Sequence, residues 1–169
     1  HRAGVICFAS RPILQQIHTW RFRLTQANLV VMASAADIAR YKENFQSEID
    51  AASTYRALAE IEKNPQLKQI YARMADIEQR HADFWQIRLG ELGITVIAKP
   101  SFRARSMQWI ARKFGVAIVL PTLVSAEQSA SGTYSDQPEA QGTEMASEEQ
   151  AHARVLKAVS QVTLKKGGM

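Results

Sequence analysis

Residues 74–82 read MADIEQRHA, and the chain repeats this stretch at residues 145–153 as MASEEQAHA. Both copies contain the motif Glu-x-x-His, which begins at Glu78 in the first copy and at Glu149 in the second. On an α-helix a step of three residues turns through about 300° and rises about 4.5 Å, so the carboxylate and the imidazole lie on one face. Each motif can therefore contribute two ligands to one metal ion.

A second pattern is duplicated ahead of each Glu-x-x-His motif. Residues 48–55 read EIDAASTY and residues 127–134 read EQSASGTY, and both contain Glu-x-x-Ala-x-x-Thr-Tyr. Di-iron and di-manganese carboxylate bundles take one Glu from each of two helices and one Glu-x-x-His from each of the other two. The order of the four motifs therefore predicts an all-α four-helix bundle with a dinuclear metal site.

The predicted site combines four carboxylates with two imidazoles. Four carboxylates in an apolar interior repel one another, and two divalent cations would balance their charge. A donor set rich in carboxylates suits iron or manganese, and zinc is a permissible occupant. The two ions of such a site lie about 3.5–4 Å apart. By the bundle template, the ligands are bridging Glu78 and Glu149, with Glu48 and His81 on one ion and Glu127 and His152 on the other.

Two tyrosines follow the lone glutamates at a fixed spacing. Tyr55 and Tyr134 each lie seven residues after a lone Glu, which is two helical turns and about 10 Å along the same face. One interpretation is a redox-active or proton-donating tyrosine near the metals. The other is a buried tyrosine with a hydrogen-bonded hydroxyl. We take both as candidate catalytic residues.

Two further acidic residues accompany the second Glu-x-x-His motif. Glu148 is either an acceptor that orients a ligand histidine or an exposed side chain, and we expect the exposed position. Glu144, five residues before Glu149, could offer an accessory metal site.

Hydrophobic periodicity places the motifs on helices. Apolar residues recur at steps of three or four around Glu48, so its carboxylate needs a cation or a hydrogen-bonding partner. Asn64-Pro65 separates the first two helices by a short turn, which makes them antiparallel neighbours. Residues 92–116 form a long crossover with a basic amphipathic helix from Phe102. We expect the first three bundle helices over residues 35–63, 65–89 and 116–134, the third with a kink near Pro121. A polar turn is expected at residues 135–141, with Pro138 at a first helical position, and the fourth helix follows to about residue 164.

The chain is predicted to have three parts. Residues 1–34 contain four Arg and no acidic residue, and we expect a poorly ordered extension of non-native or mis-started sequence; an organellar presequence is the alternative. Residues 35–164 form the metal-binding domain. Residues 165–169 end without closing structure, which we interpret as a truncated tail.

Composition excludes several other functions. The net charge of +5 comes mainly from the four Arg that precede Asp37, which leaves +1 for the rest, so nucleic-acid binding has no support. Cys7 is the only cysteine, which excludes a disulfide framework and a four-cysteine metal site. The longest apolar run, residues 116–126, is too short to span a bilayer.

Three strings carry a family resemblance, IEQRHADFW, LVSAEQSASGTY and SEEQAHARVL. Over residues 35–164 the chain resembles the rubrerythrin and ferritin-like superfamily, and most closely the N-terminal ferritin-like domain of bacterial vacuolar-iron-transporter homologues, the membrane-bound ferritins. In that group the domain faces the cytoplasm, binds iron and precedes a transmembrane transporter domain. The resemblance implies a cytoplasmic location, at the cytoplasmic face of a membrane if a transporter domain follows Met169.

The sequence departs from rubrerythrins in two respects. Those proteins carry a rubredoxin module with paired Cys-x-x-Cys motifs, which one cysteine cannot supply. They also carry a further Glu three residues after the ligand of the third helix, where this chain has Ala130. Both departures disfavour a peroxidase cycle.

Motifs and resemblance together predict a ferritin-like bundle that binds two iron ions and oxidises ferrous iron with oxygen or peroxide. Such a protein would form a homodimer and serve iron handling or transport by an attached membrane domain. A non-catalytic iron-sensing or iron-binding module is the alternative, and a peroxide reductase with an external electron donor is a third reading.

Overall fold

The computed structural model describes residues 33–167, with side chains described through residue 162. The predicted extension at residues 1–34 lies almost wholly outside the described residues. Residues from Ala35 onward form one compact unit, and its described part is all-α. The helices are α2 (Ala35–Ile61), α3 (Pro65–Glu91), α4 (Phe102–Phe114), the short 3₁₀ helix η1 (Val116–Ile118), α5 (Leu120–Asp136) and α6 (Met145–Gly167).

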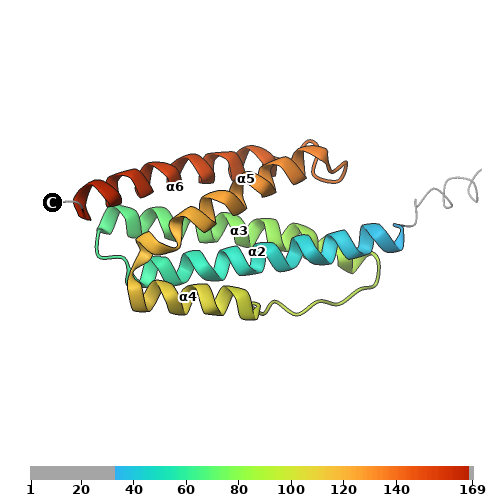
Figure 1. The fold of residues 1–169 in the computed structure, drawn as a ribbon. Coiled ribbons are helices and arrows are strands. Elements are labelled where there is room, and N and C mark those ends of the chain that lie inside the picture. The colour runs from blue at the N-terminus through green and yellow to red at the C-terminus, as the bar shows by residue number, and fades with distance from the viewer. Residues whose placement is uncertain (1–32, 168–169) are drawn as a thin grey trace, which may run out of the picture. The chain divides into compact units, whose positions relative to one another are not determined.

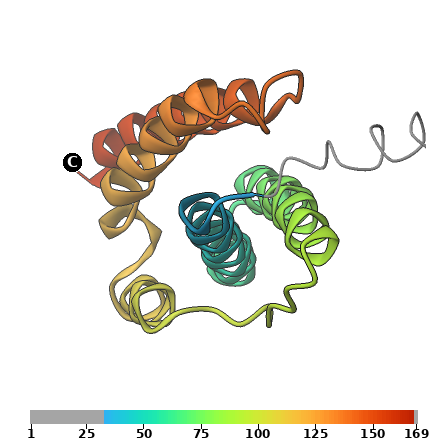
Figure 2. The ribbon, with the colours of Figure 1, turned by 90° about the vertical axis from the view of Figure 1, so that its right-hand side faces the viewer.

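Two antiparallel hairpins make the bundle, α2 with α3 and α5 with α6 (Figure 1). The crossover between them carries α4, which packs along the outside of α2 (Figure 2). This arrangement confirms the predicted all-α four-helix bundle with a long crossover between its second and third helices. None of the helices that the structure describes is both long and apolar enough to cross a membrane.

The turn between α2 and α3 forms as the sequence predicts. Asn64 is the N-cap of α3, and its side-chain Oδ1 accepts hydrogen bonds from the backbone N–H groups of Gln66, at 2.9 Å, and Leu67, at 3.3 Å. Pro65 occupies the first turn, where the missing N–H costs nothing. At its other end α3 runs through Gly90 and ends at Glu91.

The third bundle helix begins later than predicted. Gly115 has φ +93°, a conformation that favours glycine, and it separates α4 from η1. Only then does α5 start at Leu120, so Pro121 lies in its first turn and the predicted mid-helix kink is not needed.

The turn predicted at residues 135–141 is present in part, but Pro138 is not the first residue of the last helix. Residues 137–144 form a turn, and α6 begins at Met145. Long-range contacts hold this turn. Asn44 Nδ2 donates to Gln137 Oε1 at 2.7 Å, and Arg40 Nη2 donates to Glu139 Oε1 at 2.8 Å. These partners lie on α2, and local sequence signals do not report them.

Apolar layers lie on both sides of the bundle centre. Toward one end, Tyr41 and Tyr134 pack on Trp85 with ring-centroid distances of 5.4 and 5.9 Å. Toward the other end a buried cluster includes Leu58 and Leu156, both fully buried. Along each of α2, α3 and α5 the predicted ligands lie between residues of these two layers.

Candidate metal centre

All six predicted ligands converge on one buried point. Helices α2 and α5 each supply one glutamate, and helices α3 and α6 each supply a Glu-x-x-His pair. Each of the six is at most 5% exposed. They form two overlapping groups in which the ligand atoms lie within 4.8 Å of one another. The groups are Glu48, Glu78, His81 and Glu149, and then Glu78, Glu127, Glu149 and His152.

Both imidazoles present Nδ1 to the centre. His81 Nδ1 lies 3.0 Å from Glu149 Oε1 and 3.4 Å from Glu78 Oε2. His152 Nδ1 lies 2.8 Å from Glu78 Oε1 and 3.5 Å from Glu127 Oε2. Glu78 therefore faces both histidines, one with each carboxylate oxygen. This is the position that a bridging carboxylate needs.

The polar atoms at this point are close together but poorly hydrogen-bonded. Glu78 Oε1 and Oε2, Glu127 Oε2, Glu149 Oε1 and both Nδ1 atoms are buried with no hydrogen bond of acceptable geometry. Buried polar groups without partners are rare because each costs about 1–3 kcal/mol. Oxygen and nitrogen lone pairs aimed at a shared point are what divalent cations satisfy, so the donor set fits metal ions.

When no metal cation is bound, bound protons must balance the negative charge of the crowded carboxylates. Burial, followed by the nearby carboxylates, raises the pKa of Glu48 to about 8 and that of Glu149 to about 11, although His81 opposes both shifts. Burial acts in the same direction on Glu78, but the two histidines outweigh it and lower its pKa to about 2. The carboxylates around His152 raise its pKa to about 9 against the effect of burial. Metal binding at this cluster must therefore displace protons.

The two tyrosines contact the glutamates of the opposite hairpin. The Tyr55 hydroxyl donates to Glu127, and the Tyr134 hydroxyl donates to Glu48. Burial, and then the Glu127 carboxylate, raises the pKa of Tyr55 well above its ordinary value of 10.0, so this hydroxyl keeps its proton. Each lone glutamate is thus oriented by a tyrosine from the other half of the molecule. The sequence showed the matched spacing but not this exchange.

Glu148 does not occupy the exposed position that we expected. Its side chain is 24% exposed, and its Oε2 lies 2.8 Å from His81 Nε2 while its Oε1 accepts from Arg80 Nη2 at 3.1 Å. The alternative reading, an acceptor that orients a ligand histidine, is the one that the geometry supports. His152 Nε2 is buried without such a partner. Glu144, the candidate accessory ligand, is exposed and belongs to neither group.

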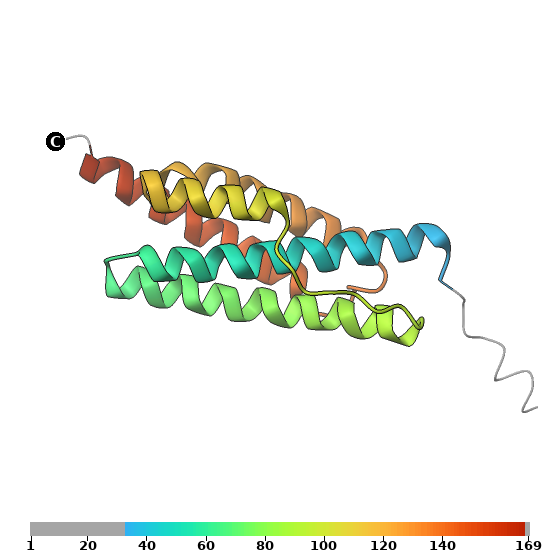
Figure 3. The same cartoon turned by 90° about the horizontal axis from the view of Figure 1, so that it is seen from below.

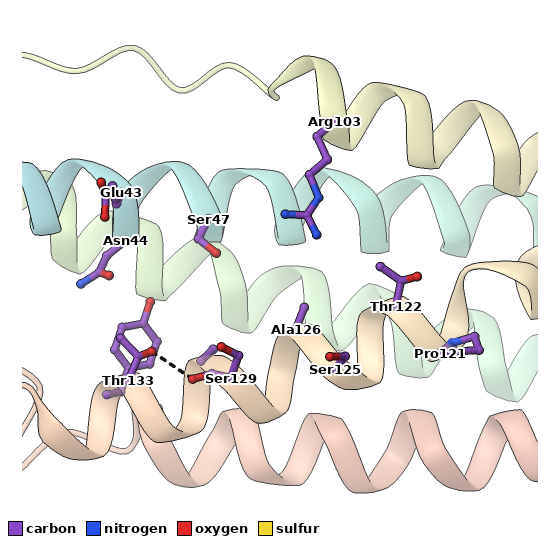
Figure 4. Close-up of a pocket in the computed structure, with 12 residues that line it drawn as sticks. Glu43, Asn44, Ser47, Arg103, Pro121, Thr122, Ser125, Ala126, Ser129 and Thr133 are labelled. Atoms are coloured by element: carbon purple, nitrogen blue, oxygen red, sulfur yellow. Dashed lines mark hydrogen bonds between the residues drawn. The ribbon is translucent and has the colours of Figure 1, made fainter.

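A groove leads from the surface toward the centre between α2, α4 and α5 (Figure 4). It encloses about 780 Å³, and Arg103 points into it from α4 toward Ser47 on α2. A smaller cavity of about 120 Å³ shares Ser47, Arg103 and Ala126 with the groove and reaches Glu127. Ala126 and Ala130 of α5 both line the groove. Small side chains therefore leave a path to one of the predicted ligands.

The Rubrerythrin family model matches residues 42–144, more than half of the chain. The chain therefore belongs to the rubrerythrin family, within the ferritin-like di-iron superfamily. The matched range contains four of the six predicted ligands and stops before Glu149 and His152, which rest on the internal repeat and on the geometry. No curated protein and no solved structure matched the chain. The family and the buried cluster together are compatible with di-iron binding.

Proposed function

We propose that this domain binds two ferrous ions in the buried cluster and oxidises them. One observation carries the proposal: the two overlapping groups of ligand atoms share Glu78 and Glu149. Two ions held by shared carboxylates must lie close together, as in other dinuclear sites. Four carboxylates also balance two divalent charges, which removes the repulsion inside an apolar core.

Each ligand has a distinct part in the proposed site. Glu78 and Glu149 bridge the ions, since each belongs to both groups. Glu48 with His81 completes one ion, while Glu127 with His152 completes the other. The hydroxyls of Tyr55 and Tyr134 fix the two lone glutamates and keep protons within reach of them.

The ferrous ions are the substrate in this proposal. Each ion gives up one electron, so the pair can reduce a two-electron acceptor in a single encounter. Dioxygen with two protons becomes hydrogen peroxide, and hydrogen peroxide with two protons becomes two water molecules. The protons displaced when the ions bind are available in the same cluster. The smaller cavity that reaches Glu127 supplies an approach for a small oxidant.

Anaerobic titration with ferrous iron tests binding, and later admission of air tests oxidation. The expected result is two tightly bound ions per chain and rapid oxygen consumption with a ferric absorbance. Glu78→Ala and Glu149→Ala should abolish both, whereas Glu144→Ala at an exposed position should change neither. Binding of fewer than two ions by the unaltered chain would contradict the dinuclear site.

The same experiment separates the alternatives. Tight binding of two ions with slow oxidation in air would support a non-catalytic iron-sensing or iron-binding module. Rapid consumption of peroxide only when an electron donor is supplied would support a peroxide reductase.

We also propose that the domain forms a homodimer and handles iron for an attached membrane transporter domain on the cytoplasmic side. This part rests on the sequence resemblance to membrane-bound ferritins. Sedimentation velocity tests the dimer. Measuring the iron content of cells that express the full reading frame, with and without Glu149→Ala, tests the role in transport. Equal iron content in the two strains would contradict it.

A further inference from the structure

Helix α4 exposes a set of aromatic side chains that nothing in the bundle covers. Phe102 is 77% exposed, Trp109 60% and Phe114 62%, and they are the exposed aromatic residues of the described part of the chain. The opposite face of α4 packs on the bundle through Ala104 and Ala111, which are 4% and 1% exposed. Side chains of this size cost free energy in water, so their concentration on one helix points to a partner.

The charge on this helix is all of one sign. Between Phe102 and Phe114 there are four basic residues and no acidic residue. Arg112 pairs with Glu60 of α2 at 3.2 Å, and Arg103 points into the groove of Figure 4. The remaining two basic residues, Arg105 and Lys113, are exposed.

The two free basic residues lie on the same half of the helix as the aromatic residues. A rotation of about 100° per residue puts Arg105 and Lys113 within about 60° of the direction of Phe102. Arg105 also lines a shallow apolar hollow of about 690 Å³ with Phe102, Trp109 and Ile110. Cationic and aromatic groups therefore form one surface, which we call the α4 face: Phe102, Arg105, Trp109, Ile110 and Lys113.

The α4 face is accessible from outside the bundle. Figure 3 looks onto this side of the molecule, where α4 lies in front of the bundle and the segment 92–101 runs up to it. That segment adds Ile97, which is 81% exposed. A broad surface can therefore approach α4 without obstruction from the described helices.

We propose that the α4 face binds the surface of a membrane that contains anionic lipids. Short amphipathic helices with aromatic residues on one face and Lys or Arg beside them lie in the interface between headgroups and acyl chains. Phe102 and Trp109 enter this interface, while Arg105 and Lys113 contact anionic headgroups. The proposal is independent of the metal centre.

A second copy of this chain is a poorer occupant. A two-fold contact places the same patch on both sides of the interface. It would bring Arg105 and Lys113 of both copies into one interface, with no acidic residue on α4 to compensate. Like charges that face each other across an interface are unfavourable.

Co-sedimentation of the full chain with sucrose-loaded vesicles tests the proposal. Vesicles of phosphatidylcholine with phosphatidylserine should bind the protein, and phosphatidylcholine alone should bind it much more weakly. The double variant Phe102→Ser/Trp109→Ser should lose at least about tenfold in partitioning, because binding scales with the apolar area that is buried. Arg105→Gln and Lys113→Gln should each cost about fivefold on anionic vesicles.

Two controls accompany these variants. Ile87 on α3 is 63% exposed, so Ile87→Ser removes a comparable apolar side chain elsewhere and should bind like the unaltered chain. Trp109→Phe should keep the binding but lose the blue shift of tryptophan fluorescence on vesicles. Far-ultraviolet circular dichroism and thermal unfolding of each variant show that the bundle is intact.

Several outcomes would overturn the proposal. One is that the unaltered chain binds neither kind of vesicle. Another is that the double Ser variant binds anionic vesicles as strongly as the unaltered chain. Equal binding to neutral and anionic vesicles would show that Arg105 and Lys113 do not contribute to binding through anionic headgroups. A dimer that the double Ser variant dissociates, without vesicle binding, would make the α4 face a contact between copies.

Discussion

Replacing Glu149 with Gln should stabilise the metal-free protein at pH 7. The Glu149 side chain is buried at 2% exposure beside three other carboxylates. Burial and these neighbours raise its pKa from the ordinary value of 4.5 to about 11, so the folded protein keeps this group protonated at neutral pH. The unfolded chain releases the proton instead, and this release favours unfolding.

The size of the effect follows from the distance between pH 7 and the ordinary pKa of 4.5. This distance is about 2.5 pH units, each worth about 1.4 kcal/mol, which gives about 3.5 kcal/mol at most. A glutamine of similar shape is neutral in both states and carries no such cost. Because the folded pKa is raised, the cost is absent below pH 4.5 and grows as the pH rises. The free energy of unfolding of the variant should therefore nearly equal that of the unaltered protein at pH 4.5 and exceed it by up to about 3.5 kcal/mol at pH 7.

Urea unfolding of the chelator-treated protein at several pH values measures this difference. Glu144→Gln is the matched control, since it removes a carboxylate at an exposed position and should change stability by less than about 0.5 kcal/mol. Saturating Mn²⁺ should reverse the order of the two proteins, because the unaltered site binds metal more tightly and gains more from mass action. A destabilised variant at pH 7, or a difference that does not change with pH, would refute the reasoning about crowded carboxylates.

Three further predictions concern other parts of the molecule. Glu148→Gln should weaken the binding of one of the two metal ions about 10–100-fold and leave the binding of the other nearly unchanged, since Glu148 contacts His81 and not His152; titration with Co²⁺ resolves the two steps. Tyr41→Phe removes the hydrogen bond to Glu139, at 2.7 Å, and should cost about 1 kcal/mol in urea unfolding. The pKa of Glu139 is lowered because the bond from Tyr41 and the Arg40 charge outweigh its burial, so this stabilisation is present above pH 4.5 and disappears as the pH falls through the folded pKa. Leu156→Ala should cost about 2–5 kcal/mol by thermal or urea unfolding without moving the ligands, because this fully buried side chain fills the apolar layer beside the site.

Sequence reasoning succeeded where the signal was local and repeated. Glu78 and His81 share a face because of the helical period alone, and the duplication of both motifs told which helices carry ligands. Asn64-Pro65 separates two helices through local interactions, because Asn64 caps the second helix and Pro65 fits its first turn. Pro138 shows the limit of this approach: it has the local character of a helix start, yet contacts with α2 hold its surroundings in a turn.

Tertiary structure alone decided which side chains meet between the hairpins. It paired Tyr55 with Glu127 and Tyr134 with Glu48, and it brought Glu148 to His81 across α3 and α6. The helical period fixes the direction in which a side chain points around the axis of its own helix. The partner that it reaches depends on the relative height and rotation of two helices far apart in the chain, which core packing sets. The sequence by itself therefore determined the donor set and the helices that bear it, while the fold determined how each donor is held.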